Sequence, residues 1–383
     1  MRVVINAQLD PATSGGIAQA LLGLASGLSR LHDADDYRFI CSPTSAAWLE
    51  PYLGPHRQMI VNEHRTPPPR RGVRPSDGFF ESFEPDVLHF PYQSYTRTEV
   101  PTVFTPHDLQ HVHLPDLFEA DELARRQTLY EQACRSAAAV ATASHAVKGD
   151  VVTHYAVDPG RVHVIPWGPP TRLYDETTQG DVLTTLERWQ LKPGFALYPA
   201  QTWPHKNHLR LLQALIHAAD RSGTRIPLVC TGAHTEYYAV LAEFITEHGL
   251  SDQARFLGRV SESDLVALYR SARCLILPSL CEASSLPILE AFCVDLPVAC
   301  SNLPALTEQF GSAALTFDPD SIDDIAHGLS TLYEDANVRC GLIAQGRKCL
   351  THFSWTRTAQ DYRDLYRAIA RQTVAASFDA ERP

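Results

Sequence analysis

The chain has 383 residues, of which 44% are apolar and 20% charged, as is ordinary for globular proteins. Its formal net charge of −11 argues against nucleic acid as a principal partner, because binding to a phosphate backbone relies on clustered Lys and Arg. No apolar run approaches the roughly 18 residues of a membrane-spanning helix, so any membrane contact is expected to be peripheral.

The nine cysteines include no CxxC pair, and no secretory signal precedes the strand-like start RVVINA. These features predict a cytoplasmic protein with reduced thiols and no disulfides.

In the first part of the chain, short β-rich runs alternate with helical patterns, which predicts βαβ units. The expected strands are 2–7, 37–41, 86–89, 102–105, 138–143 and 162–165. The expected helices are 17–31, 125–137 and 146–154.

A stretch rich in Pro, Thr and Gly, residues 166–181, interrupts the alternation, which then restarts. The expected strands there are 195–198, 227–231, 254–256, 274–277, 297–300 and 314–317. The expected helices are 207–222, one that follows a capping box of Ser261 and Asp264 and ends near Ala272, and 323–334, 336–349 and 355–370. The fold class is therefore α/β, with doubly wound parallel-sheet domains at 1–168 and 182–354 joined by a linker.

The segment HRTPPPRRGVRP, residues 64–75, is expected to be an irregular loop. It concentrates positive charge in an acidic protein. One interpretation is a solvated loop; the other is contact with an anionic acceptor or lipid head group through Arg65, Arg70, Arg71 and Arg74.

A glycine pair, Gly15 and Gly16, follows the first strand and leads into a helix. Backbone N–H groups there can approach an anion without obstruction, although by itself such a pair is more often just a tight turn. No G-x-G or Walker sequence occurs, so the usual dinucleotide and P-loop interpretations lose their support.

The segment FTPHDLQHVHLP places His107 and Asp108 directly after a strand. His107, His111, His113 and Asp108 could suggest a metal site, but nothing fixes them on one face. A single positioned histidine that donates a hydrogen bond is the favoured hypothesis, and no metal is expected.

In YPAQTWPHKNHLRLLQAL, His205 and Lys206 stand just before a helix. A lysine near a helix N-terminus is unfavourably placed unless an anion is present, which favours phosphate binding, although a lone lysine in such a loop is about as often a mere surface charge.

The segment CLILPSLCEASSLPILEAF holds Glu282 in a loop and Glu290 about one turn inside the next helix. Glu290 alone could be a partner of the helix dipole, but Glu282 could not. Two carboxylates would repel a diphosphate in direct contact, so we expect them to accept hydrogen bonds from vicinal hydroxyls. Lys206 and the helix N-termini would bind the phosphates. The pattern therefore predicts a nucleotide diphosphate-sugar site at the carboxyl ends of the strands.

At this point the chain resembles the retaining glycosyltransferases of family 4 over nearly all of its length. The resemblance rests first on a motif of two glutamates separated by seven residues, in CEASSLPILEAF. It rests also on the segments PHKN, FTPHDL, ASHAVKGDVVTHYAVDPGRVHVIPWG and FLGRVSESDLVALYRSA. It implies the GT-B architecture, two Rossmann-like domains facing a cleft. It also implies an N-terminal acceptor domain completed by a C-terminal helix within 355–383, and a C-terminal domain for the donor.

The resemblance implies a role for each site residue. Lys206 would bind the diphosphate, Glu282 the transferred sugar and Glu290 the ribose. The amide of Gly16 would contact phosphate and His107 the sugar side of the reaction centre, while the backbone of Arg259 and Val260 would contact the base. We expect His107, Lys206 and Glu282 to be catalytic and the donor site to include Gly15, Gly16, His205, Lys206, Arg259, Val260, Glu282, Ser284, Ser285, Leu286 and Glu290.

Two departures from the family pattern bear on the donor. Many members have Gly-Phe-Gly after the first glutamate, where this chain has Ala283, Ser284 and Ser285, so the sugar-facing loop is altered. Some relatives carry an arginine at the position of Ala200, and His205 is a candidate to replace it.

The expected function is transfer of a hexose with retention, without a cofactor, from a nucleotide-diphosphate sugar to a glycan, lipid-linked or small-molecule acceptor. We favour mannose from a guanosine donor over a uridine donor, in polysaccharide or glycoconjugate biosynthesis, by resemblance to bacterial mannosyltransferases. The alternatives are a glycoside hydrolase, an epimerase on the same fold and a non-catalytic nucleotide-sugar binding partner.

Overall fold

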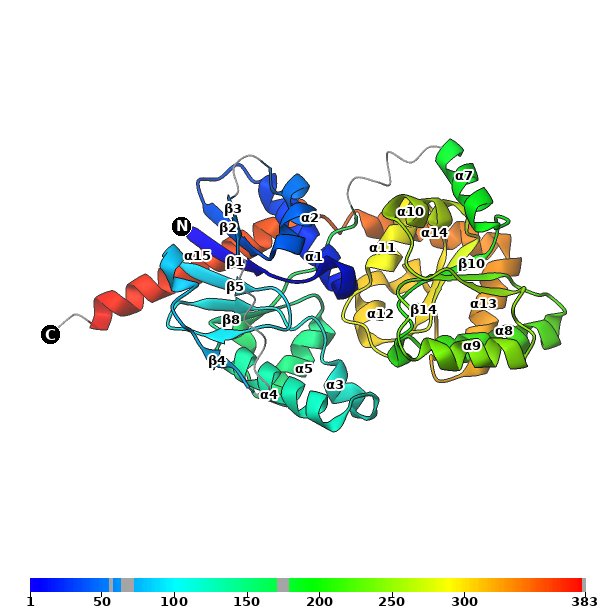
Figure 1. Ribbon diagram of the computed structural model, residues 1–383, viewed down its shortest axis with the longest axis horizontal. Coiled ribbons are helices and arrows are strands. Elements are labelled where there is room, and N and C mark those ends of the chain that lie inside the picture. Colours follow the sequence, from blue (N-terminus) through cyan, green and yellow to red (C-terminus); the bar gives the residue numbers. More distant parts are fainter. Residues whose placement is uncertain (55–57, 63–71, 171–178, 381–383) are drawn as a thin grey trace. The chain divides into compact units, whose positions relative to one another are not determined.

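The computed structural model describes residues 1–54, 58–62, 72–170 and 179–380, which form two compact units (Figure 1). Unit 1 comprises Met1–Gly168 and Phe353–Pro383, and unit 2 comprises Pro169–His352. None of the helices in these described ranges is both long and apolar enough to cross a membrane.

Unit 1 contains a parallel sheet whose described strands have the order β3-β2-β1-β5-β7-β8-β9. Their bounds are β1 (Arg2–Ala7), β2 (Asp36–Cys41), β3 (Gln58–Val61), β5 (Val87–Phe90), β7 (Thr102–Phe104), β8 (Ala139–Thr142) and β9 (Val162–Val164). The helices are α1 (Pro11–Ser29), α2 (Pro43–Leu53), α3 (Gln110–His113), α4 (Ala120–Ser136), α5 (His145–Tyr155) and α15 (Trp355–Ala380). A two-residue strand, β4 (Arg74–Pro75), pairs with β6 (Thr96–Arg97).

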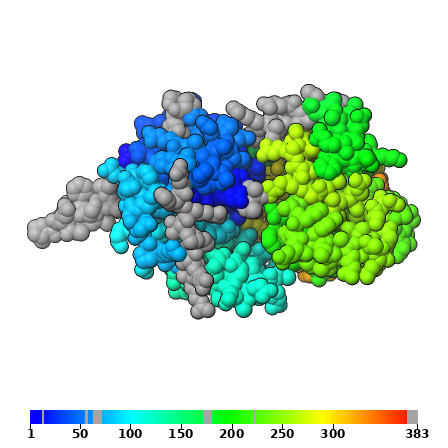
Figure 2. Space-filling model, in the orientation of Figure 1, coloured from blue at the N-terminus to red at the C-terminus, as the bar shows by residue number. Residues whose placement is uncertain are grey.

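Unit 2 repeats this plan with the strand order β12-β11-β10-β13-β14-β15. The strands are β10 (Ala196–Pro199), β11 (Leu228–Thr231), β12 (Ala254–Phe256), β13 (Cys274–Leu277), β14 (Val298–Ser301) and β15 (Leu315–Phe317). The helices are α7 (Gln179–Trp189), α8 (His208–Ser222), α9 (Tyr238–Glu247), α10 (Glu262–Ser271), α11 (Leu286–Cys293), α12 (Pro304–Phe310), α13 (Ile322–Glu334) and α14 (Ala336–Leu350). Figure 2 shows that residues of α7 to α10 form much of the visible face of this unit.

The strand orders place a topological switch point in each unit, the position where ligands bind in doubly wound sheets. In unit 1 the switch point lies between β1 and β5, and in unit 2 between β10 and β13. At a switch point, the connections that follow two neighbouring strands run in opposite directions along the sheet. In doubly wound sheets this leaves a crevice at the carboxyl ends of those two strands.

The central strands form because short runs of β-branched and other apolar residues are buried on both faces, as parallel strands require. Val3 and Ile5 are fully buried, and Val3 pairs with Tyr37 on one side and Val87 on the other. The sequence predicted every strand of unit 2 and all of unit 1 except β3, β4 and β6. The strand β4 lies within the segment that we expected to be wholly irregular.

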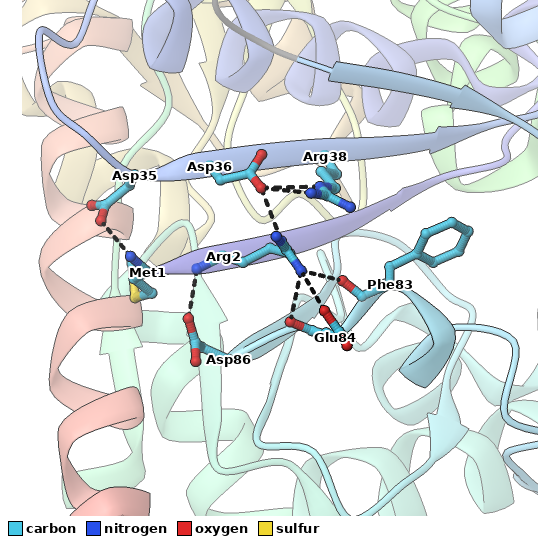
Figure 3. A network of polar contacts seen from close by, with 8 residues as sticks. All are labelled: Met1, Arg2, Asp35, Asp36, Arg38, Phe83, Glu84 and Asp86. Carbon is cyan, nitrogen blue, oxygen red and sulfur yellow. Dashed lines mark hydrogen bonds and ion pairs between the residues drawn. The ribbon is translucent and has the colours of Figure 1, made fainter.

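The amino ends of the strands in unit 1 are joined by charged contacts around Arg2 (Figure 3). Its guanidinium donates to Asp36 at the start of β2, at 2.9 Å, and to the carbonyl of Phe83, at 3.0 Å. Its amide donates to Asp86, which precedes β5, at 2.6 Å. Arg2 therefore ties the amino end of β1 to the start of β2 and to the segment before β5.

The last helix, α15, belongs to the core of unit 1. Gly23 and Gly27 on α1 leave the space that Trp355 fills, because a Cβ on either glycine would overlap Trp355. Tyr362 and Tyr366, further along α15, are buried in the same core as Val3. The close approach of the two helices thus depends on residues without side chains.

The predicted capping box at α10 is only half formed. Ser261 accepts from the amide of Asp264, as predicted. The carboxylate of Asp264 does not turn back to Ser261; it accepts from Arg188 at 2.7 and 2.9 Å and from Thr185 at 2.9 Å. A nearby cation and hydroxyl from α7 are better partners for a buried carboxylate than one backbone amide.

Candidate functional site

The site residues of unit 2 follow the two strands at its switch point. Lys206 ends the loop after β10, directly before Asn207 and α8, and Glu282 lies in the loop after β13. Glu290 is the fifth residue of α11, so both glutamates occupy the predicted elements.

Several hydrogen bonds hold these loops together. The Tyr198 hydroxyl donates to the Lys206 carbonyl at 2.7 Å. The side-chain amide of Asn207 donates to the carbonyls of Pro278 at 3.0 Å and Pro319 at 2.8 Å. The Leu280 amide donates to the His205 carbonyl at 2.8 Å. The backbone around Lys206 is therefore fixed to the loop that carries Glu282.

Lys206 and Glu282 form an ion pair, with Nζ 2.6 Å from Oε1. The two side chains are 21% and 13% exposed, so the pair is largely shielded from water. This contact revises the argument that Lys206 is unfavourably placed without a ligand, because Glu282 supplies a negative charge from within the protein.

The N-terminus of α8 lies next to this pair and has no cap from its N-cap side chain. Asn207, at φ 61, occupies the left-handed region that Asn tolerates, and its side chain does not cap the helix. The amides of the first turn and the helix dipole favour an anion at this end.

The second glutamate has a different environment. The Tyr269 hydroxyl donates to Oε2 of Glu290 at 2.5 Å. Burial raises the pKa of Glu290 to about 7, the hydrogen bond from Tyr269 opposes this shift, and the charge of Glu262 adds to it. The structure thus gives Glu282 and Glu290 separate partners, and their action on one ligand stays a prediction.

The residues between the glutamates are engaged in the fold. Ser284 donates to Gln309 at 2.7 Å, and Gln309 donates to the carbonyl of Ala283 at 3.1 Å. Ser285 caps α11 by accepting from the amide of Ile288, and Leu286 is buried. The side chains of Ser284 and Ser285 therefore shape the loop.

The predicted contacts of unit 2 also include Arg259 and Val260, on the loop after β12, and His205, on the same loop as Lys206. Arg259 is exposed and Val260 is half-buried; they follow Gly258, whose carbonyl accepts from the amide of Gly232 at 2.8 Å. His205 is half-buried beside Lys206. Their proposed roles toward base and phosphate stay predictions.

In unit 1 the glycine pair marks a break within α1. Gly15 has φ 49 and ψ −125, a conformation open essentially to glycine alone. Gly16 starts the helix proper and is exposed, and a Cβ there would meet no atom within 4 Å. The helix thus begins at Gly16, slightly before the predicted residue 17, with open space around it.

His107 is buried directly beyond β7, with its backbone in the left-handed region at φ 64. Its Nε2 lies 2.7 Å from the carbonyl of Pro91. A carbonyl only accepts, so Nε2 carries the proton and Nδ1 is an acceptor. Burial lowers the pKa of His107, which favours this neutral form. Nδ1 has no hydrogen-bond partner among the described residues.

The neighbouring residues of His107 form a buried polar network. Nε2 of His89 lies 3.0 Å from the Thr105 hydroxyl, and its Nδ1 lies 2.7 Å from the Tyr366 hydroxyl. His89 lies on β5, which ends one residue before Pro91, and Thr105 directly follows β7, two residues before His107. The network therefore fixes both segments that position His107.

The metal alternative is not supported by the contacts of the other histidines. His111 pairs with the Tyr155 hydroxyl at 2.9 Å, and His113 with Asp150 at 2.7 Å. Within the described ranges, no three His, Cys, Asp or Glu residues are grouped as a metal site would require.

The basic segment can be placed only in part. Arg74 is exposed on β4. Arg65, Arg70 and Arg71 lie outside the described residues, so the hypothesis of a membrane or acceptor contact stays untested.

Sequence reasoning missed the residues that hold the site. Tyr269, Gln309, His89 and Tyr366 act across long sequence distances and carry no local motif. Asn207 had a signal, because an Asn between a loop and a helix commonly adopts the left-handed conformation.

Comparison with known families assigns both halves of the chain. The family model described as Glycosyltransferase Family 4 matches residues 14–172, and the model described as Glycosyl transferases group 1 matches residues 187–349. The first match covers most of unit 1 and runs four residues into unit 2, and the second lies within unit 2.

Curated relatives agree with this assignment. The chain is 30% identical over 269 residues to O-antigen chain mannosyltransferase B of Escherichia coli, covering 70% of each chain. It is 29% identical over 297 residues to a D-inositol 3-phosphate glycosyltransferase of Corynebacterium glutamicum, covering 72% of this chain and 68% of the relative.

Solved structures share the fold. The Anabaena protein HepE, solved with UDP and glucose, superimposes with a TM-score of 0.73 at 18% identity, covering 96% of this chain and all (100%) of HepE. A glycosyltransferase of Rickettsia africae gives a TM-score of 0.74 at 16% identity, covering 96% and 98% of the two chains. The structure is therefore of the GT-B type, with two Rossmann-like domains. From its family matches and its curated relatives, we conclude that the chain belongs to glycosyltransferase family 4, the glycosyl transferases of group 1.

Proposed function

We propose that the protein is a retaining hexosyltransferase that uses a nucleotide-diphosphate sugar as donor. The observation that carries this proposal is the Lys206–Glu282 pair, which lies at the switch point of unit 2 beside the N-terminus of α8, an end that its N-cap side chain does not cap. A cation and free helix amides suit a diphosphate, and an adjacent carboxylate suits sugar hydroxyls.

In the proposed complex, the diphosphate replaces Glu282 as the partner of Lys206 and also contacts the α8 amides and the amide of Gly16. Glu282, once released, accepts hydrogen bonds from the hydroxyls of the transferred sugar. Glu290 binds the ribose, the backbone of Arg259 and Val260 contacts the base, and His107 accepts a hydrogen bond from a hydroxyl on the sugar side.

The proposed reaction breaks the bond between the anomeric carbon and the phosphate oxygen while the acceptor oxygen attacks from the same face. The acceptor proton passes to the departing phosphate oxygen, so no protein nucleophile is needed. Negative charge develops on the leaving diphosphate, and Lys206 stabilises it more strongly in the transition state than in the ground state. Trapping of a glycosyl group on Glu282 would overturn this scheme in favour of a covalent intermediate.

The preferred donor in this proposal is GDP-mannose, and the acceptor is a glycan or lipid-linked glycan of a polysaccharide pathway. Support comes from the likeness to O-antigen chain mannosyltransferases. HepE was solved with UDP and UDP-glucose, so a uridine donor is the competing choice. The proposed place of action is the cytoplasm, with peripheral contact to the inner face of the membrane.

A thermal-shift panel of GDP-mannose, UDP-glucose and related nucleotide sugars tests donor binding. A ligand at 100 times its dissociation constant adds about 2.7 kcal/mol of stability, which is easily measured. We expect stabilisation by GDP-mannose that Lys206→Ala largely removes and that Arg347→Ala, a change in the exposed Arg347–Asp295 pair, preserves. No stabilisation by any nucleotide sugar would contradict the proposal.

Two product measurements sharpen the assignment. NMR of the product should show the anomeric configuration of the donor, whereas inversion would exclude a retaining reaction. The proposed steps involve no metal, so turnover should be unchanged after treatment with EDTA, and loss of turnover that Mg²⁺ restores would contradict that assignment.

A further inference from the structure

Tyr269 reaches across from α10 to the carboxylate of Glu290 on α11. Its hydroxyl lies 2.5 Å from Oε2 of Glu290 and 3.3 Å from the carbonyl of Pro287. A phenol has one proton to donate, and the shorter distance assigns that proton to the carboxylate. The ring of Tyr269 is 1% exposed, so the donor is held rigidly by its surroundings.

This contact restricts what Glu290 can do. A carboxylate on a glutamate side chain normally samples several rotamers, and ordering it reduces its entropy. With Oε2 held by Tyr269, rotation of the carboxylate is restricted, while Oε1, for which the described residues show no hydrogen bond, and the remaining lone pair of Oε2 can accept from a ligand. That arrangement fits two neighbouring hydroxyls that donate side by side.

The charge state of Glu290 gives the contact a second effect. Burial raises the pKa of this carboxyl, the nearby charge of Glu262 raises it further, and the hydrogen bond from Tyr269 lowers it. Tyr269 therefore favours the ionised form, which accepts hydrogen bonds. A protonated carboxyl would offer a donor of its own where a diol needs acceptors.

We propose that Tyr269 is a positioning residue that orients Glu290 toward the vicinal hydroxyls of the nucleotide's ribose and so sets a preference for ribonucleotides over deoxyribonucleotides. The inference rests on the proposed function, because it requires a nucleotide in unit 2. It goes beyond that function because it names the residue that governs selection between ribose and deoxyribose. That residue is a buried tyrosine that does not itself contact the ligand.

Calorimetric titration with GDP, UDP and their 2′-deoxy and 3′-deoxy counterparts tests the inference. A hydrogen bond to a charged group is worth roughly 1.5–3 kcal/mol, so the wild type should bind the better ribonucleotide about 10- to 100-fold more tightly than its deoxy forms. Tyr269→Phe keeps the ring and removes only the hydroxyl. It should reduce this discrimination to about 3-fold or less, mainly by weakening binding of the ribonucleotide.

Three further variants separate positioning from general damage. Glu290→Gln should lose the same discrimination, and the double variant should lose little more, because both changes act on one interaction. Tyr333→Phe, on α13 beside Arg273, is the matched control and should bind as the wild type does. The melting temperature of each variant checks that it folds.

The outcomes distinguish this inference from the proposed function. If the wild type binds neither nucleotide, the proposed function fails. If the wild type discriminates against the deoxy forms and folded Tyr269→Phe discriminates equally well, the role of Tyr269 is refuted while the function stands. Equal loss of affinity for ribo and deoxy forms would also refute it, because that pattern indicates general structural damage.

Discussion

The two units present opposite kinds of chemistry at the same place in the same fold. Near its switch point, unit 2 has an ion pair, Lys206 with Glu282, beside a helix N-terminus that its N-cap side chain does not cap. Unit 1 has two buried histidines with neutral partners: His107 pairs with the Pro91 carbonyl, and His89 with the hydroxyls of Thr105 and Tyr366. The sheet topology alone therefore does not determine the chemistry of the site.

This difference indicates which kind of ligand group each unit can bind. Charged groups that are paired but partly accessible can exchange an internal partner for an ionic ligand such as a diphosphate. A buried imidazole fixed in one tautomer offers a directed acceptor with no charge, which suits a hydroxyl. The predictions that follow test this contrast between a charged site in unit 2 and a neutral site in unit 1.

The largest expected effect is at the charged site. Loss of one preorganised group that stabilises developing charge typically lowers turnover about 10²- to 10³-fold, and we expect this for Lys206→Ala. Steady-state release of nucleotide from the donor measures it. Arg347→Ala removes a cation from the same unit and should leave turnover unchanged; near-normal turnover of Lys206→Ala would remove this lysine from the mechanism.

Stability against pH tests the second carboxylate of unit 2. The pKa of Glu290 is raised from 4.5 to about 7, so between these values the folded protein holds a proton that the unfolded chain has released. The wild type therefore loses stability from this group as pH rises from about 4.5 to about 7, on the order of 2 to 3 kcal/mol in all.

Glu290→Gln lacks this titration and should gain stability relative to the wild type as pH rises. Urea unfolding of both proteins at pH 5 and pH 8 measures the difference in their free energies of unfolding. Titrating groups that the two proteins share contribute equally to both and so drop out of this difference. A stability difference that does not change with pH would contradict the raised pKa.

In the neutral network of unit 1, Tyr366→Phe removes the donor or acceptor that pairs with Nδ1 of the buried His89. An unsatisfied buried polar group costs about 1–3 kcal/mol, so the free energy of unfolding should fall by that amount. Urea unfolding at pH 7.5 measures it, with Tyr333→Phe as the control. No change in stability would indicate that the network contributes nothing to the attachment of α15.

The smallest expected effect on rate is at His107. Asn tolerates the left-handed backbone at this position, so His107→Asn removes the imidazole while it keeps the backbone conformation. Loss of a hydrogen bond between neutral groups, about 0.5–1.5 kcal/mol, should lower turnover about 3- to 10-fold. A loss as large as that of Lys206→Ala would show that His107 carries charge in the reaction and would break the contrast.

The sequence predicted the sheets well because buried parallel strands are short apolar runs that local patterning reveals. Residues 2–7 and 254–256 have the predicted bounds. The strand β3 escaped prediction because its residues Gln58–Val61 are only half-buried or exposed, and such an edge strand lacks a continuous apolar run.

The site was predictable in its elements and not in its contacts. The positions of Lys206, Glu282 and Glu290 at strand ends and in a helix follow from local patterns. The pairing of Lys206 with Glu282, 76 residues apart, depends on how β10 and β13 adjoin, which no local pattern contains. The same holds for Tyr269 with Glu290 and for the space that Gly23 and Gly27 leave for Trp355.

The most direct test of the account is a structure of the wild-type protein with its stabilising nucleotide sugar bound. The account predicts that Nζ of Lys206 leaves Glu282 and lies within hydrogen-bond distance of a diphosphate oxygen, with the released carboxylate on the hydroxyls of the sugar. A bound donor whose diphosphate lies elsewhere, with the Lys206–Glu282 pair intact, would contradict it.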